Sequence, residues 1–330
     1  MTAAIVLPAG GAPDRAGRTA EGGGLRPRRA DGGPDHAEGA GSIEIHPQIL
    51  IAADEYGDTV TAAGLLTHYG LEGSDATGES WGPAAPYTMP QDLTYVATLG
   101  PLGGYEFAGA EPLPSFPGIL DNRRLDWARF FSYATLPGGR FMLNWPILGN
   151  DYGADYLAPD ADRPAILDAA KKKTLRLVGE LQQRFPDAPL DRISTPYPTR
   201  DSLPPIPYIR EARRVYGRRL LTLDAIARPY VPEYRGLLDE AIAVGNYPVD
   251  HHRLEDPEAP EIDFPPIPAF SIPLGALLTD EVENLVVAEK SVSVSGLANG
   301  ATRLQPVAML IGQAAATVAS LAVERGTPPG

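Results

Sequence analysis

Hydrophobic residues recur at helical spacing in two long segments of the chain. Between residues 162 and 185 apolar side chains return every three to four positions, and an aspartate and a proline at the start are typical of a helix N-terminus. Residues 304–325 form a second, more apolar segment that is rich in small residues. It is nearly as long as a membrane span, but polar residues and a proline interrupt it, which favours a buried helix over a span.

Short apolar runs predict strands at three places. Residues 49–53 form one run, which ends in an acidic, glycine-containing turn. Residues 92–99 alternate between apolar and polar positions as a half-buried strand does. Residues 284–288 form a third run, which we expect to be a buried strand followed by a polar, serine-rich crossing over 289–298.

The middle of the chain is rich in proline and glycine. Residues 129–135 and 138–143 suggest a hairpin around Pro137, Gly138 and Gly139. Thirty-five prolines and 35 glycines imply many turns and irregular connections. Strands and helices alternate around them, so the pattern favours a mixed α/β fold.

Residues 1–42 differ from the rest of the chain. Ten of these residues are glycine, none is aromatic, and no hydrophobic period is visible. We interpret this segment as a disordered or non-native leader, and its proline, arginine and glycine content suits translation of GC-rich DNA in a wrong frame. Ordered sequence is expected from about Ser42.

The composition excludes several classes of protein. It is 43% hydrophobic and 21% charged, as in globular proteins, and the net charge of −14 argues against a nucleic-acid groove. The absence of cysteine excludes disulfides, zinc–thiolate sites and iron–sulfur clusters. No signal peptide is visible at the start, so we expect a soluble, cytoplasmic protein with no nucleic-acid or membrane partner.

The C-terminal strand, turn and helix predict a ligand-binding edge. We expect residues 299–303 to form a small-residue turn before the helix that starts near Leu304. Free N–H groups and the positive end of the helix dipole would then face a partly negative ligand edge. The candidate binding residues are Gly300, Ala301, Thr302, Arg303, Leu304 and Gln305.

Two further segments carry charged or titratable groups. Arg210 and Arg213 would project from one side of a helix or turn and suit carboxylates or phosphates, although a surface salt-bridge cluster is an alternative. His251 and His252 lie beside Asp250, which makes this segment the best place for a proton-transfer group. A metal held by Asp250 and His252 is a weaker alternative, because no third ligand is in view, and we expect none.

Five segments in order, over residues 43–325, resemble the FAD-dependent oxidoreductases with a glutathione-reductase-like fold, and in particular a bacterial subgroup labelled as xanthan-lyase-related. The segments are Ile51–Asp58, Gly139–Asp151, Pro207–Gly217, Gly245–His252 and Pro273–Arg325. Several positions depart from the family pattern, and Asp54 and Glu55 stand where small residues are common. Leu148 replaces an expected histidine, Ala212 a serine, and Glu289 a glycine that follows the last strand.

The resemblance implies that FAD lies between a Rossmann-type domain and a mixed-sheet domain for a small-molecule substrate. It places Gly57, Asp58 and residues 300–305 near the flavin, and Arg210, Arg213 and His252 toward the substrate. The expected domains are 43–90, a remnant of the FAD-binding domain; 91–270, a substrate domain; and 271–330, the C-terminal part of the FAD-binding domain.

The printed sequence has no strand followed by Gly-x-Gly-x-x-Gly, the usual pyrophosphate cradle. We therefore expect a truncated or misframed gene product whose Rossmann-like domain is incomplete. Two other functions stay open. One is a non-catalytic remnant or binding module that holds a saccharide with Trp145, and the other is a polysaccharide lyase that uses Tyr247, His252 and Arg210.

Overall fold

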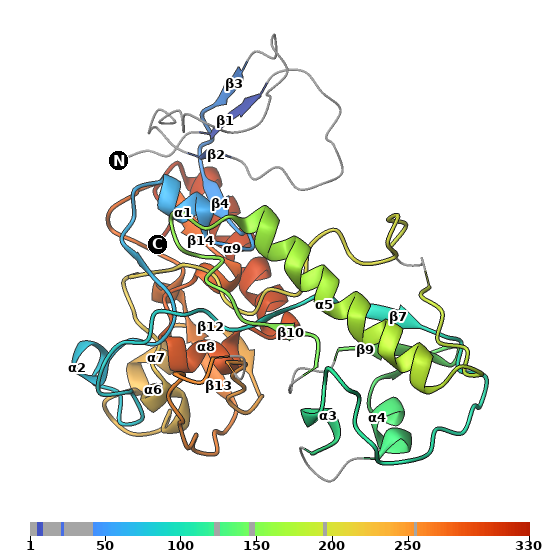
Figure 1. Cartoon of the computed structure of the whole chain (residues 1–330). Helices are drawn as coiled ribbons and strands as arrows, with labels where there is room; N and C mark the ends of the chain where they lie inside the picture. The colour runs from blue at the N-terminus through green and yellow to red at the C-terminus, as the bar shows by residue number, and fades with distance from the viewer. Residues whose placement is uncertain are drawn as a thin grey trace. The chain divides into compact units, whose positions relative to one another are not determined.

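A computed structural model gives the structure of the chain (Figure 1). It describes residues 5–8, 21–22, 42–121, 126–144, 149–193, 197–253 and 256–330. The chain divides into two compact units. Unit 1 comprises Met1–Met89, Glu211–His251 and Pro260–Gly330, and unit 2 comprises Pro90–Arg210 and His252–Ala259. The boundaries differ from the expected ones, because residues 211–251 and 260–270 lie with unit 1 and not with the substrate domain.

Unit 1 contains mostly short elements and one long helix. They are β1 (Ile5–Pro8), β2 (Glu21–Gly22), β3 (Ser42–Ile45), β4 (Leu50–Ala52), α1 (Asp58–Ala62), β5 (Thr67–His68), α2 (Ser74–Thr77), β11 (Arg214–Val215), α6 (Leu223–Ala227), α7 (Arg235–Asp239), β12 (Ala241–Gly245), β13 (Phe270–Pro273), η1 (Leu274–Ala276), β14 (Leu285–Val287), η2 (Glu289–Ser291), α8 (Gly296–Thr302) and α9 (Gln305–Arg325). The predicted strands near 50 and 285 and the predicted helix over 304–325 are confirmed.

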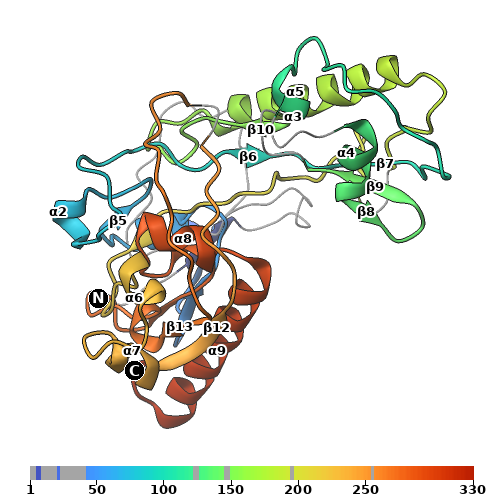
Figure 2. The ribbon, with the colours of Figure 1, turned by 90° about the horizontal axis from the view of Figure 1, so that it is seen from below.

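The core of unit 1 forms around a parallel strand pair, β4 and β14, in which Leu50 lies opposite Leu285 and Ala52 opposite Val287. All three residues of β14 are buried, as expected for a strand in the interior of an α/β unit. Helix α9 packs against β4, β14 and β12, and Figure 2 shows α9 beside β12. Strands β12 and β13 pair antiparallel and form a second two-stranded sheet in this unit.

Only one face of α9 is buried. Val307, Ile311 and Ala315 join the core, whereas Met309 is 75% exposed. Among the small residues of this helix, Ala315 is buried but Gly312 is exposed, so the small residues do not form one packing face. By length and composition α9 could cross a membrane, and it is the one helix of the described chain that meets this test.

Unit 2 contains two small sheets and a long helix. Its elements are β6 (Leu93–Thr94), β7 (Ala97–Leu99), α3 (Gly118–Asp121), α4 (Trp127–Tyr133), β8 (Thr135–Leu136), β9 (Arg140–Leu143), β10 (Asp151–Tyr152) and α5 (Arg163–Arg184). The predicted helix is confirmed as α5, whose N-cap Asp162 accepts a hydrogen bond from the Ala165 N–H at 3.1 Å. Strand β9 pairs antiparallel with β7 and β8, and β10 pairs with β6.

Two predictions in this unit are wrong in detail. The strand over 92–99 is two strands, β6 and β7. The first arm of the predicted hairpin is helix α4, because Asp126 caps it and Trp127, Phe130 and Phe131 follow helical spacing toward the core. The hairpin that does form is shorter and joins β8 to β9.

The N-terminal segment also departs from expectation. Where no regular element was predicted before Ser42, β1 pairs antiparallel with both β2 and β3. Backbone groups of extended segments can pair in this way without a hydrophobic period. The remainder of the proposed leader lies outside the described residues, as do Trp145 and Leu148.

Candidate functional site

The carboxyl edge of β4 and β14 brings two of the predicted segments together in unit 1. Because the strands are parallel, the turn after β4 and the segment after β14 leave the sheet at the same edge, where ligands bind in α/β proteins. The ammonium group of Lys290 joins the two segments: it lies 2.8 Å from the Glu55 carboxylate and 2.6 Å from that of Glu289. Burial alone would lower the pKa of Lys290, but these two carboxylates outweigh burial and hold the pKa above its usual value.

Glu289 has an unusual backbone conformation at this edge. Its φ is +60°, in the left-handed region that favours glycine. Burial raises the pKa of its carboxyl group above the usual value, and Lys290 opposes that shift. The glycine expected from the family pattern would adopt this φ without strain, so the glutamate is held there by its surroundings.

The turn of Gly57 and Asp58 is docked on Arg213. The Asp58 carboxylate lies 2.7 Å from the Arg213 guanidinium, and the Arg213 N–H donates to the Tyr56 carbonyl at 3.1 Å. Gly57 has φ +72°, and a Cβ there would lie 2.4 Å from the Arg213 carbonyl oxygen. The Asp54 carboxylate accepts from the N–H of Asp58 at 2.7 Å, so the acid that departs from the family pattern caps the turn.

The predicted turn over 299–303 is wrong, because these residues continue helix α8 as far as Thr302. Ser295 is the N-cap of α8, and its hydroxyl accepts a hydrogen bond from the Ala298 N–H at 3.1 Å. This cap stabilises the helix more than the glycine and asparagine, which suggested a turn, disfavour it. Gly300, Ala301 and Thr302 are buried in this helix. A Cβ on Gly300 would lie 2.3 Å from the His251 ring, so this glycine serves close packing.

Arg303 is held by Asp250 in unit 1. Its guanidinium donates to the Asp250 backbone carbonyl and carboxylate, both at 3.0 Å, and its side chain is 2% exposed. Leu304 caps α9 without a side-chain hydrogen bond, and Gln305 is exposed in the first turn. The structure therefore places residues 300–303 in the core and leaves Leu304 and Gln305 nearer the surface.

Arg210 and Arg213 do not share a face. The segment is extended and not helical, with Arg210 in unit 2 and Arg213 in unit 1. The surface salt-bridge alternative is also wrong, because Arg210 is 1% and Arg214 0% exposed. Arg214, which the sequence analysis did not single out, lies in unit 1 between the carboxylates of Glu72 and Glu211.

His252 belongs to a buried polar network in unit 2. Its Nδ1 lies 2.9 Å from the Asp151 carboxylate, and the Arg210 guanidinium lies 3.1 Å from the same carboxylate. Thr94 hydrogen-bonds to Asp151 as well, because β6 and β10 place these two residues opposite each other. A histidine oriented by a carboxylate, with a cation beside it, is an arrangement that can move a proton and hold an anion.

Asp151 is the functional candidate that sequence reasoning missed. Asp151 follows Gly149 and Asn150, two residue types that are typical of turns. Asn150 donates to the Tyr95 carbonyl at 2.8 Å and to the Leu143 carbonyl at 3.1 Å, which fixes the entry to β10. An acidic residue directly after a turn and at the start of a strand was the available signal.

The metal alternative at Asp250 and His252 finds no support in the geometry. These residues do not share a strand, because β12 ends at Gly245, and they belong to different units. Asp250 pairs with Arg303 and His252 with Asp151. Within the described residues no group of three or more His, Asp or Glu side chains could hold a metal ion.

The edge in unit 1 has polar groups that fit one side of a flavin. Ser291 is 1% exposed, and its hydroxyl has no hydrogen-bond partner among the described residues. Buried hydroxyl groups are nearly always paired, so an unpaired one beside Lys290 suits a polar ligand edge. The Gly57 turn, which packs closely on Arg213, borders the same edge.

The chain was compared with known proteins. A family model described as FAD dependent oxidoreductase matches residues 35–330. No curated protein and no solved structure matches the chain. The match covers both units and all the residues that form the two polar sites, so the chain belongs to the FAD-dependent oxidoreductase family, whose cofactor is FAD.

Proposed function

We propose that the chain is a flavin oxidoreductase in which the carboxyl edge of β4 and β14 holds the flavin and the network around Asp151 serves the substrate. The Gly57 turn, Lys290 and Ser291 meet at one edge of a parallel strand pair, and this observation supports the proposed flavin site. FAD, when bound, supplies the exchange of two electrons with the substrate. The protein residues would bind, orient and exchange protons.

In unit 1, each of these residues has a defined task in the proposal. Gly57 lets the turn pack closely on Arg213, and the ion pair of Asp58 with Arg213 keeps the turn in place. Lys290 provides positive charge, and Ser291 a hydroxyl group that can donate to a carbonyl oxygen. The proposed fold is glutathione-reductase-like with an incomplete Rossmann-like domain, and no residue is assigned to the pyrophosphate.

In unit 2, His252 is the proposed acid–base group. Asp151 holds its Nδ1, so Nε2 is the atom that would exchange a proton with the substrate. Arg210 would hold an anionic or developing negative group, and its guanidinium also lies 3.1 Å from the Asp151 carboxylate. The proposed substrate is an unidentified small molecule, and the proposed protein is cytoplasmic and acts without nucleic acid or membrane.

A visible absorption spectrum of the purified protein, before and after incubation with FAD, tests the flavin part. A stoichiometric flavin spectrum supports the proposal. Arg213→Gln should lower FAD retention, whereas Arg218→Gln, which removes an exposed arginine paired with Asp280, should not. A folded protein that stays colourless with excess FAD would instead support a non-catalytic remnant or binding module.

The role of His252 requires a separate measurement. In FAD-loaded protein, His252→Gln should slow reduction of the flavin by a substrate roughly 10²–10⁴-fold without loss of FAD. Release of unsaturated sugar from a polysaccharide without flavin would support a lyase of the xanthan-lyase-labelled subgroup and contradict the redox proposal.

A further inference from the structure

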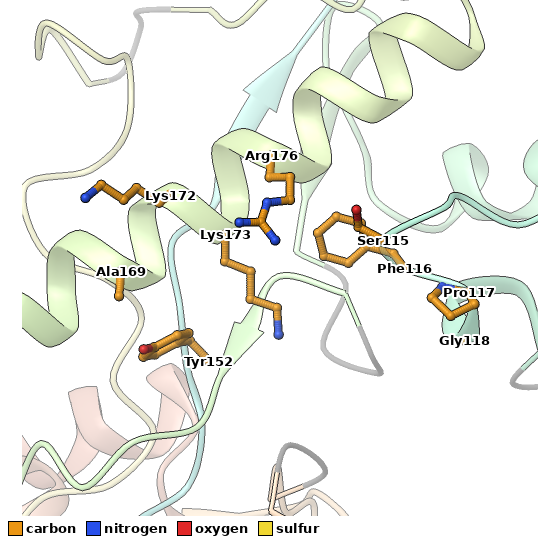
Figure 3. A pocket seen from close by; sticks show the side chains of 9 residues that line it. All are labelled: Ser115, Phe116, Pro117, Gly118, Tyr152, Ala169, Lys172, Lys173 and Arg176. Carbon is orange, nitrogen blue, oxygen red and sulfur yellow. The ribbon is translucent and has the colours of Figure 1, made fainter.

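Unit 2 contains a cavity of about 570 Å³ that none of the roles above uses (Figure 3). Its walls are the start of α3 with the residues before it, β10, and one side of α5. The lining residues are Ser115, Phe116, Pro117, Gly118, Tyr152, Ala169, Lys172, Lys173 and Arg176. This volume lies within the range of small-molecule pockets.

The cavity is positively charged. Lys172, Lys173 and Arg176 come from consecutive turns of α5, and no acidic side chain is among the described residues that line the cavity. The whole chain has a net charge of −14, so a local group of three cations stands out against its surroundings. Such a group favours anions.

The three cations differ in their surroundings. Lys172 pairs with Asp168 at 2.6 Å on the helix surface, and Figure 3 shows its side chain directed away from those of Lys173 and Arg176. Lys173 donates to the backbone carbonyl of Asp151 at 2.6 Å, which fixes its ammonium group beside β10. Arg176 has no ion-pair partner within the part of the chain that the structure describes.

An apolar wall faces the arginine. In Figure 3 the guanidinium of Arg176 points toward the Phe116 ring, and Phe116 is 4% exposed, so its position is set by packing. Tyr152 supplies a second ring from β10. A flat apolar group can lie on these rings while a guanidinium holds a carboxylate or phosphate by two parallel hydrogen bonds.

We propose that this cavity binds a small organic anion, an aromatic carboxylate or phosphate, with the anionic group on Arg176 and Lys173 and the ring against Phe116 and Tyr152. Every residue that forms this cavity belongs to unit 2, whereas the residues of the proposed flavin edge belong to unit 1. The Lys173 hydrogen bond to Asp151 connects it to the residue that orients His252. The proposal does not depend on flavin binding.

Isothermal titration with benzoate, phenyl phosphate and the neutral benzamide tests the site on the full chain. We expect both anions to bind, benzamide to bind at least roughly tenfold more weakly, and added salt to weaken the anions. The tighter of the two anions then identifies the preferred class. Equal binding of benzamide and benzoate, or no binding of either anion at about 10 mM, would overturn the proposal.

Two matched variants localise the binding. Arg176→Gln should weaken the tighter anion roughly ten- to hundredfold, because a charge-assisted hydrogen bond is lost. Lys172→Gln removes the same charge from the same helix but from a side chain that points away, and it should leave affinity within about twofold. Equal losses in the two variants would reject Arg176 as the anion ligand, and Arg176→Lys distinguishes charge from the paired geometry of the guanidinium. A thermal melt confirms that each variant folds.

Discussion

Replacement of Gly57 by alanine should destabilise unit 1 in two separable ways. A left-handed φ costs a residue with a Cβ about 1–2 kcal/mol, and Gly57 has φ +72°. In addition, the new Cβ would lie 2.4 Å from the Arg213 carbonyl oxygen and 3.0 Å from the Arg213 Cβ and nitrogen. Relief of such a clash requires backbone shifts that cost about 1–3 kcal/mol. The expected total is therefore about 2–5 kcal/mol.

Gly78 provides a matched control for the first term. Its φ is +70°, almost the same as that of Gly57, but a Cβ there would meet nothing within 4 Å. Gly78→Ala should therefore lose only the conformational term of about 1–2 kcal/mol. The difference between the two variants isolates the contact with Arg213.

Thermal unfolding followed by circular dichroism measures this difference. For a unit of this size about 1 kcal/mol corresponds to roughly 2–4 °C, so Gly57→Ala should melt about 2–12 °C below Gly78→Ala. The FAD content of the two proteins should differ in the same order, because the turn borders the proposed flavin edge. Equal melting temperatures would refute the inferred packing of Gly57 on Arg213.

Three further predictions concern single residues. Asp151→Asn leaves the buried Arg210 without its carboxylate and should destabilise unit 2 by about 3–5 kcal/mol in urea unfolding, whereas a loss under about 1 kcal/mol would contradict the network. Glu289→Gly relieves a φ of +60° and should raise the free energy of unfolding in urea by about 1 kcal/mol at most, whereas a loss of stability would show that the contact with Lys290 outweighs the strain. Burial lowers the pKa of His68 despite its bond to Glu72, so the unfolded chain binds more protons as the pH falls through the ordinary value of about 6.5, and stability should decrease there by at most about 1.4 kcal/mol per pH unit. His68→Gln should flatten that slope in pH-dependent urea unfolding, and an unchanged slope would assign it to other groups.

Local signals predicted the long helices well. Helix α5 could be read from Asp162 and the apolar spacing behind it, and the strand at 285–287 from its apolar run. Helix α8 could not, because glycine and asparagine within 299–303 favour a turn locally, and only its burial and the Ser295 cap make it helical. Tertiary packing outweighs weak local propensity in such short helices.

The polar sites could be predicted only in part, because they depend on distant pairings. Asp58 and Arg213 were both expected to have functional roles, but nothing in their local sequence pairs residues that lie 155 positions apart. Arg210 and Arg213 were expected to act together, and an extended chain separates them. Asp151 lies opposite Thr94 in the two-residue pairing of β10 with β6. Strands this short do not specify their register, so the sequence alone could not predict this contact.

The parallel pairing of β4 with β14 also dictates when the proposed cofactor edge can form. Leu50 and Leu285 are paired although they lie 235 positions apart in the chain. At a synthesis rate of about 5–20 residues per second, the ribosome needs roughly 10–50 s to make the intervening chain. Contacts of such long sequence separation also form slowly in refolding. The edge can therefore form only after β14 has been made, and a nascent chain that stops before β14 carries the Gly57 turn without the strand that completes the edge.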